Sequence, residues 1–155
     1  MTFGDIVQAD FVDHYGNLTL KSVAMLDWYH KHCSRAKFLL KADEDIWLNL
    51  NETERFLSTG LASGTPGKDH GLLTFVCEVW KDAPATMDRR DKHYAQCDRR
   101  IWGLYRYPKY CGGPAYLMSS ALARLLHKEA FLEGARRFRL EDVYITGFLP
   151  LPIEG

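Results

Sequence analysis

The sequence predicts an α/β protein with a mixed central sheet flanked by helices. Its 155 residues have the length of a single domain. Hydrophobic residues make up 46% of the chain and charged residues 26%, which is an ordinary globular composition. Segments rich in β-formers alternate along the chain with segments of helical periodicity, and this alternation is typical of the α/β class.

The chain is expected to begin with a short strand over residues 5–10 and to continue in a helix. Four apolar side chains recur at helical spacing and therefore share one face: Leu18, Met25, Leu26 and Tyr29. Asn17 or Thr19 is suited to cap this helix, because both side chains can accept a hydrogen bond from a free backbone N–H group.

Two more strands and a short helix are expected next. Residues 37–41 (KFLLK) and 46–50 (IWLNL) have the apolar content of strands. Residues 51–54 (NETE) combine a capping asparagine with acids, which is typical of a helix start. Gly, Ser, Thr and Pro are frequent in residues 60–71 and predict a loop.

The second half of the chain is expected to open with a strand over residues 72–80 (LLTFVCEVW). Residues 81–100 are polar and show little periodicity, so they predict a long surface loop of the kind that often carries function. Glycine and proline make residues 107–114 a predicted tight turn, which leads into an apolar run over 115–118.

Two helical segments complete the chain. The first has apolar side chains at helical spacing: Met118, Leu122, Leu125 and Leu126. Ser119 or Ser120 lies near its expected N-cap. Residues 141–143 open a final apolar segment, which Pro150 and Pro152 are expected to interrupt.

The charge balance excludes some partners. Twenty Lys and Arg residues match twenty Asp and Glu residues, so the formal net charge is +0. Nucleic acid is therefore not an expected partner, since its binding depends on a surplus of cationic side chains.

The sequence also has no predicted membrane span, because no run approaches the roughly 20 apolar residues that span a bilayer.

The four cysteines are widely separated and form no Cys-x-x-Cys pair. A structural zinc site or a thioredoxin-type redox centre is therefore not expected. An even number of cysteines allows two disulfides in any of three connectivities, or four reduced thiols in a reducing compartment.

Three consecutive acids follow the predicted strand 37–41. On an extended backbone, Asp43 and Asp45 share a face while Glu44 points away from it. Carboxylates at the carboxyl end of a strand lie where α/β sheets bind ligands, and such hard oxygen ligands suit Mg²⁺ or Mn²⁺ bound together with a diphosphate. The alternative is a solvated acidic turn.

Two further motifs have both a structural and a functional interpretation. Glu141 and Asp142 precede the last apolar segment, where acids stabilise a helix N-terminus or one acid serves as a general base. Gly112 and Gly113 allow the backbone to approach a ligand closely, or form a plain turn.

Four segments, taken in order, resemble the β-1,3-glycosyltransferases of the galactosyltransferase family, which are inverting enzymes that use a UDP-sugar. The similar segments are residues 5–21 (DIVQADFVDHYGNLTLK), 36–49 (AKFLLKADEDIWLN), 107–119 (YPKYCGGPAYLMS) and 141–147 (EDVYITG). The resemblance implies a glycosyltransferase-A (Rossmann-like) fold with a nucleotide-sugar site at the edge of the central sheet.

The resemblance also implies the metal site. It places the family's Asp-x-Asp motif on Asp43, Glu44 and Asp45, with Mn²⁺ as the cofactor. Asp45 would bind Mn²⁺ directly, and Asp43 would lie near the metal, the ribose and the diphosphate. Glu44 replaces a commoner aspartate within this donor-binding motif, and its side chain is expected to face away from the metal.

The catalytic base implied by the resemblance is Asp142, with Glu141 as its donor-binding neighbour. Gly112 and Gly113 would lie along the donor sugar. Asp142 would take the proton of the attacking sugar hydroxyl, which is a poor nucleophile on its own. A divalent cation would offset the charge of the departing UDP.

The expected function is transfer of galactose or N-acetylglucosamine from a UDP-sugar to a glycan on protein or lipid, in β-1,3 linkage. Residues 1–155 would form one partial catalytic domain, with the anchor, stem and first strands missing before it and the final part missing after it. The family implies the luminal side of the Golgi membrane, reached through an anchor outside this chain. The alternatives are a non-catalytic relative that binds carbohydrate or nucleotide, and a metal-dependent phosphohydrolase using Asp43 and Asp45.

Overall fold

The computed structural model confirms the α/β class and describes residues 4–33, 35–60, 73–94, 106–132 and 138–154. Its helical elements are η1 (Tyr15–Asn17), α1 (Leu18–His32), α2 (Leu50–Arg55), η2 (Phe56–Gly60), α4 (Ser120–Leu132), α5 (Glu141–Val143), η3 (Tyr144–Phe148) and α6 (Leu151–Glu154). Its strands are β1 (Phe38–Ala42), β2 (Phe75–Trp80) and β3 (Tyr110–Ser119).

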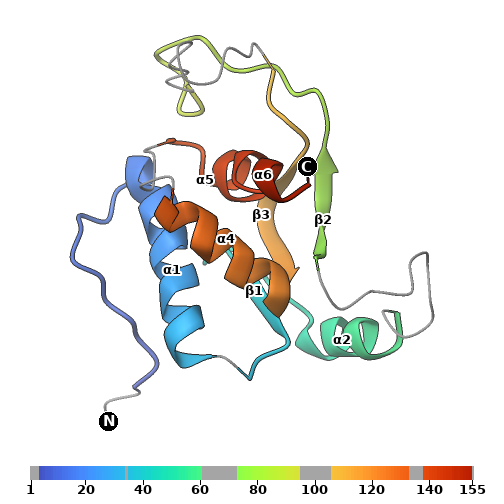
Figure 1. The fold of residues 1–155 in the computed structure, drawn as a ribbon. Helices are drawn as coiled ribbons and strands as arrows, with labels where there is room; N and C mark the ends of the chain where they lie inside the picture. The colour runs from blue at the N-terminus through green and yellow to red at the C-terminus, as the bar shows by residue number, and fades with distance from the viewer. Residues whose placement is uncertain (1–3, 34, 61–72, 95–105, 133–137, 155) are drawn as a thin grey trace.

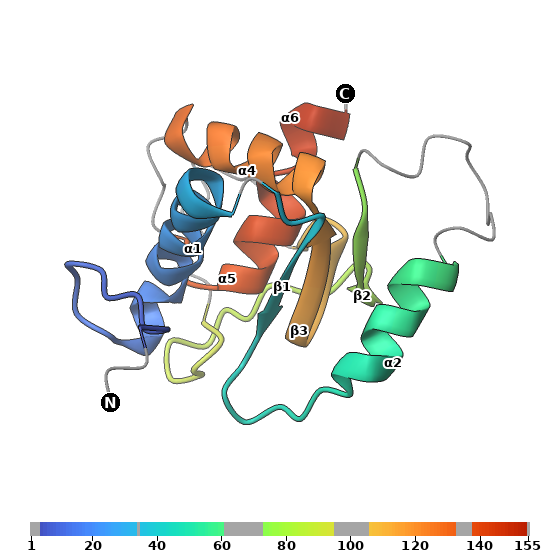
Figure 2. The same cartoon turned by 90° about the horizontal axis from the view of Figure 1, so that it is seen from below.

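The three strands form one sheet in the order β1-β3-β2. Both strand pairs are antiparallel, so the mixed sheet predicted from the sequence is not what the described residues form. Helices α1, α4 and α5 lie on one face of this sheet, and α2 lies on the other (Figures 1 and 2). A groove lined by Leu40, Phe56 and Leu117 separates α2 from the strands.

The predicted turn over residues 107–114 is wrong, because the central strand β3 runs through most of it. Strand partners on both sides outweigh the local turn preference of its glycines and proline. Pro114 lacks an N–H group, but its carbonyl accepts a hydrogen bond from the Asp43 backbone N–H at 2.8 Å. The register shift between Val76 and Glu78 of β2 lies opposite this part of β3, and such an irregularity tolerates proline inside a sheet.

The strands predicted over residues 5–10 and 46–50 are also wrong. Ile6 is 88% exposed and Trp47 is 83% exposed, and none of the described strands pairs with either segment. Without a neighbouring strand, β-forming side chains have neither a ladder nor a packed face to stabilise an extended segment. Helix α2 begins at Leu50 and is capped by Asn49, whose side chain accepts a hydrogen bond from the Glu52 N–H at 3.2 Å.

Helix α1 forms as predicted, but its buried face differs from the predicted one. The buried residues of α1 are Thr19, Ser22, Val23, Leu26 and Tyr29. Leu18 and Met25 are only half-buried. The predicted face was chosen from apolar residues alone, whereas Thr19 and Ser22 are buried because their hydroxyl groups donate hydrogen bonds to the C-terminal part of the chain.

Helix α4 forms as predicted and packs against α1 (Figure 1). The Ser119 hydroxyl accepts a hydrogen bond from the Leu122 N–H at 3.3 Å, which agrees with the predicted capping role. The final apolar segment is buried from Val143 to Leu149 and reaches a turn at Pro150, as predicted. Pro152 does not interrupt it, because this proline lies in the first turn of α6, where its missing N–H is tolerated.

A disulfide joins Cys77 of β2 to Cys111 of β3, with Cα atoms 5.5 Å apart. Cys33 carries a free thiol, and Cys97 lies outside the described residues, as do most of the predicted loop 60–71 and the end of the predicted loop 81–100. Within the part of the chain that the structure describes, every helix is too short or too polar to cross a bilayer.

Candidate active site

The three consecutive acids lie at the end of β1 in a turn, and not on the extended backbone that the sequence predicted. The Ile46 N–H donates a hydrogen bond to the Asp43 carbonyl at 3.3 Å, which closes the turn around Glu44 and Asp45. All three acidic residues are exposed. The chain turns here because pairing between β1 and β3 ends at Ala42.

Glu141 begins α5 and is buried, with 6% of its surface exposed. Its Oε1 accepts hydrogen bonds from the Ser22 hydroxyl at 2.7 Å and from the Tyr116 hydroxyl at 2.5 Å. Burial raises the pKa of the Glu141 carboxyl, and the positive charge of Lys41 and these two donors partly offset the increase. Glu141 therefore connects α1, β3 and α5 from the centre of the fold.

Lys41 connects the acidic turn to Glu141. Its Nζ lies 2.5 Å from Asp43 Oδ1 and 3.6 Å from Glu141 Oε2, and 5.7 Å from the centre of the Tyr116 ring. Burial lowers the pKa of Lys41, but the hydrogen bond to Asp43 and the charge of Glu141 outweigh this and leave the pKa above its usual value. One ammonium group thus holds together the two acidic motifs, which are about a hundred residues apart in the sequence.

Asp142 lies next to Glu141 and is half-buried. Its Oδ1 accepts a hydrogen bond from the Val143 N–H at 2.8 Å. Burial raises the pKa of the Asp142 carboxyl, while the Val143 N–H and the charge of Lys41 lower it. A carboxyl whose pKa is raised in this way is a better proton acceptor at neutral pH than an ordinary surface aspartate.

Thr146 fixes the position of Asp142 relative to the sheet. The Thr146 hydroxyl donates a hydrogen bond to the Asp142 carbonyl at 2.6 Å and accepts one from the Cys111 N–H at 2.8 Å. The Tyr110 ring, next to Cys111 in β3, lies close enough to Asp142 that the carboxylate adds to the effect of burial in raising the tyrosine pKa. The predicted base thus lies beside the start of β3.

The two glycines of β3 differ in their surroundings. Gly112 is buried, and a Cβ atom at this position would lie 2.4 Å from Cδ1 of Trp80. Gly113 is exposed, and its φ of +89° strongly favours glycine. The close approach allowed by Gly112 is therefore an approach to an indole ring, while a Cβ atom on Gly113 would lie 3.9 Å from Oε2 of Glu78.

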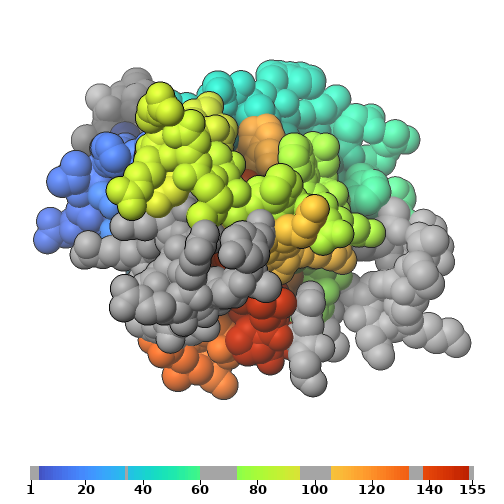
Figure 3. All heavy atoms as spheres, turned by 90° about the horizontal axis from the view of Figure 1, so that it is seen from above, coloured from blue at the N-terminus to red at the C-terminus, as the bar shows by residue number. Residues whose placement is uncertain are grey.

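The turn after β1, the start of β3 and the segment 81–94 meet at one end of the sheet (Figure 2). In the space-filling view, atoms of β3 (orange) can be seen between the segment after β1 (teal) and the segment after β2 (yellow-green) (Figure 3). The structure thus brings Asp43, Glu141 and Asp142 to the same region, linked through Lys41.

Three residues of this region had not been predicted as functional: Lys41, Tyr116 and Ser22. Lys41 has a sequence signal, since it is a charged residue in an otherwise apolar strand directly before three acids. Tyr116 and Ser22 have none, because each is placed beside Glu141 only by the packing of distant elements.

The carboxylates of the acidic turn fit a metal ion that is bound together with a diphosphate. Within the described residues, no group of three His, Cys, Asp or Glu side chains could hold a metal ion by itself. Asp43 and Asp45 are exposed and offer hard oxygen ligands. Mg²⁺-like ions are commonly held by one or two carboxylates with the remaining ligands from substrate phosphates and water.

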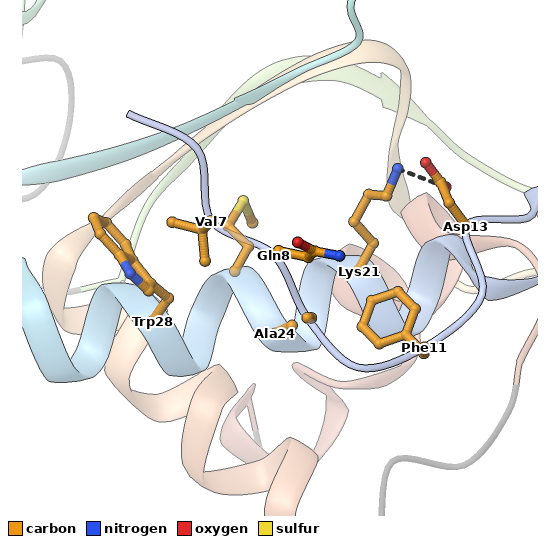
Figure 4. A pocket seen from close by; sticks show the side chains of 9 residues that line it. Val7, Gln8, Phe11, Asp13, Lys21, Ala24 and Trp28 are labelled. Carbon is orange, nitrogen blue, oxygen red and sulfur yellow. Dashed lines mark ion pairs between the residues drawn. The ribbon is translucent and has the colours of Figure 1, made fainter. Parts of the chain in front are cut away.

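A separate pocket of about 590 Å³ lies between the N-terminal segment and α1 (Figure 4). Val7, Phe11 and Trp28 contribute its apolar walls, and an ion pair between Asp13 and Lys21, 2.8 Å apart, lies at one end. It contains none of the acidic residues described above, so the candidate active site is the cluster around Lys41.

Comparison with known proteins agrees with the family suggested by the sequence motifs. The family model described as Galactosyltransferase matches residues 1–153. The rat protein named UDP-GlcNAc:betaGal beta-1,3-N-acetylglucosaminyltransferase 7 is 33% identical over 143 residues, which cover 92% of this chain and 33% of that protein. The mouse and human proteins named Beta-1,3-galactosyltransferase 1 are 32% identical over 143 residues, which cover 92% of this chain and 40% of each relative. The chain therefore spans between a third and two fifths of the length of these curated relatives.

Proposed function

The chain belongs to the galactosyltransferase family, and we propose that it forms part of the catalytic domain of a UDP-sugar β-1,3-glycosyltransferase with a glycosyltransferase-A fold. The single observation that carries this proposal is the link that Lys41 makes between the acidic turn and the start of α5. It holds Asp43 of the proposed metal-binding turn beside Glu141, the neighbour of the proposed base Asp142. Metal-bound carboxylates and a general base are the two groups that an inverting sugar transfer needs.

The proposed reaction transfers galactose or N-acetylglucosamine from the UDP-sugar to a hydroxyl group of a glycan. Asp142 accepts the proton of that hydroxyl as its oxygen forms a bond to the anomeric carbon of the donor. The bond between this carbon and the diphosphate breaks, and UDP leaves. Because attack and departure occur on opposite faces in one step, an α-linked donor gives a β-linked product.

Asp43 and Asp45 are the residues that would hold Mn²⁺ in this proposal. A divalent cation bound there supplies charge neutralisation for the diphosphate. Glu44 and Gly113 are exposed at the same end of the sheet and would border the donor sugar, while Gly112 is buried against Trp80. Asp43 also contacts Lys41, so its carboxylate is held in place before any metal binds.

Glu141 and Lys41 would position the reacting groups. The buried Glu141 carboxylate accepts hydrogen bonds from α1 and β3, and this fixes the N-terminus of α5 from which Asp142 projects. Lys41 then ties the acidic turn to the same carboxylate. The distance between the proposed metal-binding turn and the proposed base would thus be set by the ion pair of Lys41 with Glu141 rather than by the exposed turn itself.

The proposal extends to the luminal side of the Golgi, where the acceptor would be a glycan on protein or lipid. The disulfide between Cys77 and Cys111 supports an oxidising compartment. The segment 81–94 runs along the candidate site and would help to select the acceptor (Figure 2).

The proposal is tested by measuring UDP release and sugar transfer from UDP-galactose and UDP-N-acetylglucosamine to lactose in the presence of Mn²⁺. Asp142→Asn should lower the turnover by about 10²- to 10⁴-fold, the usual contribution of a general base. Asp10→Asn, at an exposed position that takes no part in the contacts described around Lys41, is the matched control and should retain full turnover.

The outcomes separate the alternatives. Full turnover in Asp142→Asn would contradict the assignment of the base. UDP binding without transfer by the unaltered chain would instead favour the non-catalytic relative. Release of inorganic phosphate without an acceptor would favour a phosphohydrolase.

A further inference from the structure

We propose that Trp80 and Tyr110 form an acceptor platform, an aromatic surface on which the pyranose ring of the acceptor sugar stacks. This inference rests on the proposed function and names where its second substrate binds. Trp80 and Tyr110 lie at the paired ends of β2 and β3, followed by the pair of Glu78 and Gly112.

The two aromatic residues are direct partners across the strands. Trp80 pairs with Tyr110 in the β2–β3 register, and their ring centroids are 6.4 Å apart with an interplanar angle of 33°. The Tyr107 ring packs edge-on against Tyr110 with centroids 6.0 Å apart, which holds the tyrosine in place. The two rings therefore form one continuous aromatic surface and not two separate side chains.

Because Gly112 has no side chain, the indole of Trp80 packs directly against the sheet. A Cβ atom at position 112 would lie 2.4 Å from Cδ1 and 2.6 Å from Nε1 of Trp80, closer than real atoms pack. Trp80 nevertheless remains 47% exposed. The ring is thus supported on its inner side by a residue without a side chain and presented to solvent on the other, as a stacking surface must be.

The aromatic surface lies next to the proposed base. The Thr146 hydroxyl binds both the Cys111 N–H and the Asp142 carbonyl, so the strand that carries Tyr110 is attached directly to the residue that would receive the acceptor proton. The charge of Asp142 also contributes to the raised pKa of Tyr110, after burial. A sugar stacked on this surface would have its hydroxyl groups near Asp142.

The polar groups near the platform suit a neutral sugar. Glu78 projects from the same face of β2 as Trp80, two residues away, and its Oε2 lies 3.9 Å from the position of a Cβ on Gly113. Glu78 and Asp142 thus place carboxylates near the platform. Carboxylates beside an aromatic ring suit a pyranose, whose C–H groups contact the ring while its hydroxyl groups donate hydrogen bonds.

The test is saturation-transfer NMR with lactose as the probe and the whole chain as the receptor. Lactose ends in a β-galactose ring, and the platform predicts the strongest transfer to the C–H protons on one face of that ring. Trp80→Ala should weaken lactose binding at least about fivefold, consistent with the roughly 1 kcal/mol that an aromatic contact contributes. Trp80→Phe, which keeps a stacking ring, should restore most of it.

Two further variants sharpen the test. Gly112→Ala should also weaken lactose binding, because the new methyl group must displace the indole. The matched control is Trp28→Ala, which removes a 40% exposed tryptophan from α1, away from β2 and β3, and should leave lactose binding unchanged. Undiminished lactose binding in folded Trp80→Ala would overturn the platform.

UDP binding, measured by calorimetry with Mn²⁺ on the same samples, separates the two proposals. A chain that binds UDP but not lactose refutes the platform and leaves the proposed function standing. A chain that binds neither refutes both. Loss of lactose binding in Trp80→Ala with unchanged UDP binding assigns the platform to the acceptor.

Discussion

The two acidic motifs of the candidate site have opposite surroundings. Asp43, Glu44 and Asp45 lie in an exposed turn, where Lys41 is the partner of Asp43. Glu141 is buried and is met by a lysine, a serine and a tyrosine from three other elements. A buried carboxylate requires such partners, whereas water solvates an exposed carboxylate, which therefore remains available to a ligand. The difference separates the part of the site that holds the fold together from the part that is free to bind.

The largest expected effect tests the buried half of this comparison. Lys41→Met leaves the Glu141 carboxylate without its cation and should reduce the free energy of unfolding by about 3 kcal/mol, measured by urea denaturation. Lys21→Met is the matched control, because it breaks an exposed ion pair to Asp13 and should cost less than about 1 kcal/mol. Equal losses in both variants would show that Glu141 does not depend on Lys41.

A smaller effect tests the exposed half. Asp45→Asn should change the free energy of unfolding by less than about 0.5 kcal/mol, since the side chain is exposed. The same variant should weaken Mn²⁺-dependent UDP binding by at least about tenfold, roughly 1.4 kcal/mol, measured by calorimetry. Asp10→Asn should bind UDP like the unaltered chain. Retained UDP binding in Asp45→Asn would remove Asp45 from the metal site.

The smallest effect concerns pH. Burial raises the pKa of the Glu141 carboxyl in the folded state. The stability that the protonated Glu141 carboxyl contributes is therefore fully present below its unfolded pKa near 4.5 and is lost as pH rises through the folded pKa. Between pH 4 and pH 8, the melting temperature of Glu141→Gln should therefore fall less than that of the unaltered chain, measured by thermal melts.

Asp27 provides a comparison of opposite sign. Hydrogen bonds from Lys31 and His127 lower its pKa, so its contribution is present above its unfolded pKa near 3.8 and is lost as pH falls. Asp27→Asn should therefore make the stability of the protein depend less on pH on the acid side.

For the Glu141 prediction, a stability–pH profile of Glu141→Gln that equals that of the unaltered chain would show that the Glu141 carboxyl is not perturbed by burial.

Local periodicity predicted the elements whose stabilisation is mostly local. The helices α1 and α4 and the strand β1 were expected nearly where they occur, and so was the capping hydroxyl of Ser119. The prediction failed for β3, where Gly112, Gly113 and Pro114 indicate a turn if read alone. Pairing with β1 on one side and β2 on the other decides this segment, and neither partner is close to it in sequence.

By itself, the sequence determined the α/β class, the family and the acidic residues that the family resemblance marks. These follow from composition, from periodicity and from four motifs in order, all of which are properties of the chain. Only the tertiary structure decided that Lys41 joins Asp43 to Glu141, that the Asp43–Asp45 segment is a turn, and that Trp80 rests on Gly112. The contacts of Lys41 with Glu141 and of Trp80 with Gly112 join residues that the chain separates and the fold brings together, and the turn begins where the pairing of β1 with β3 ends. Such long-range contacts leave no pattern in the local sequence.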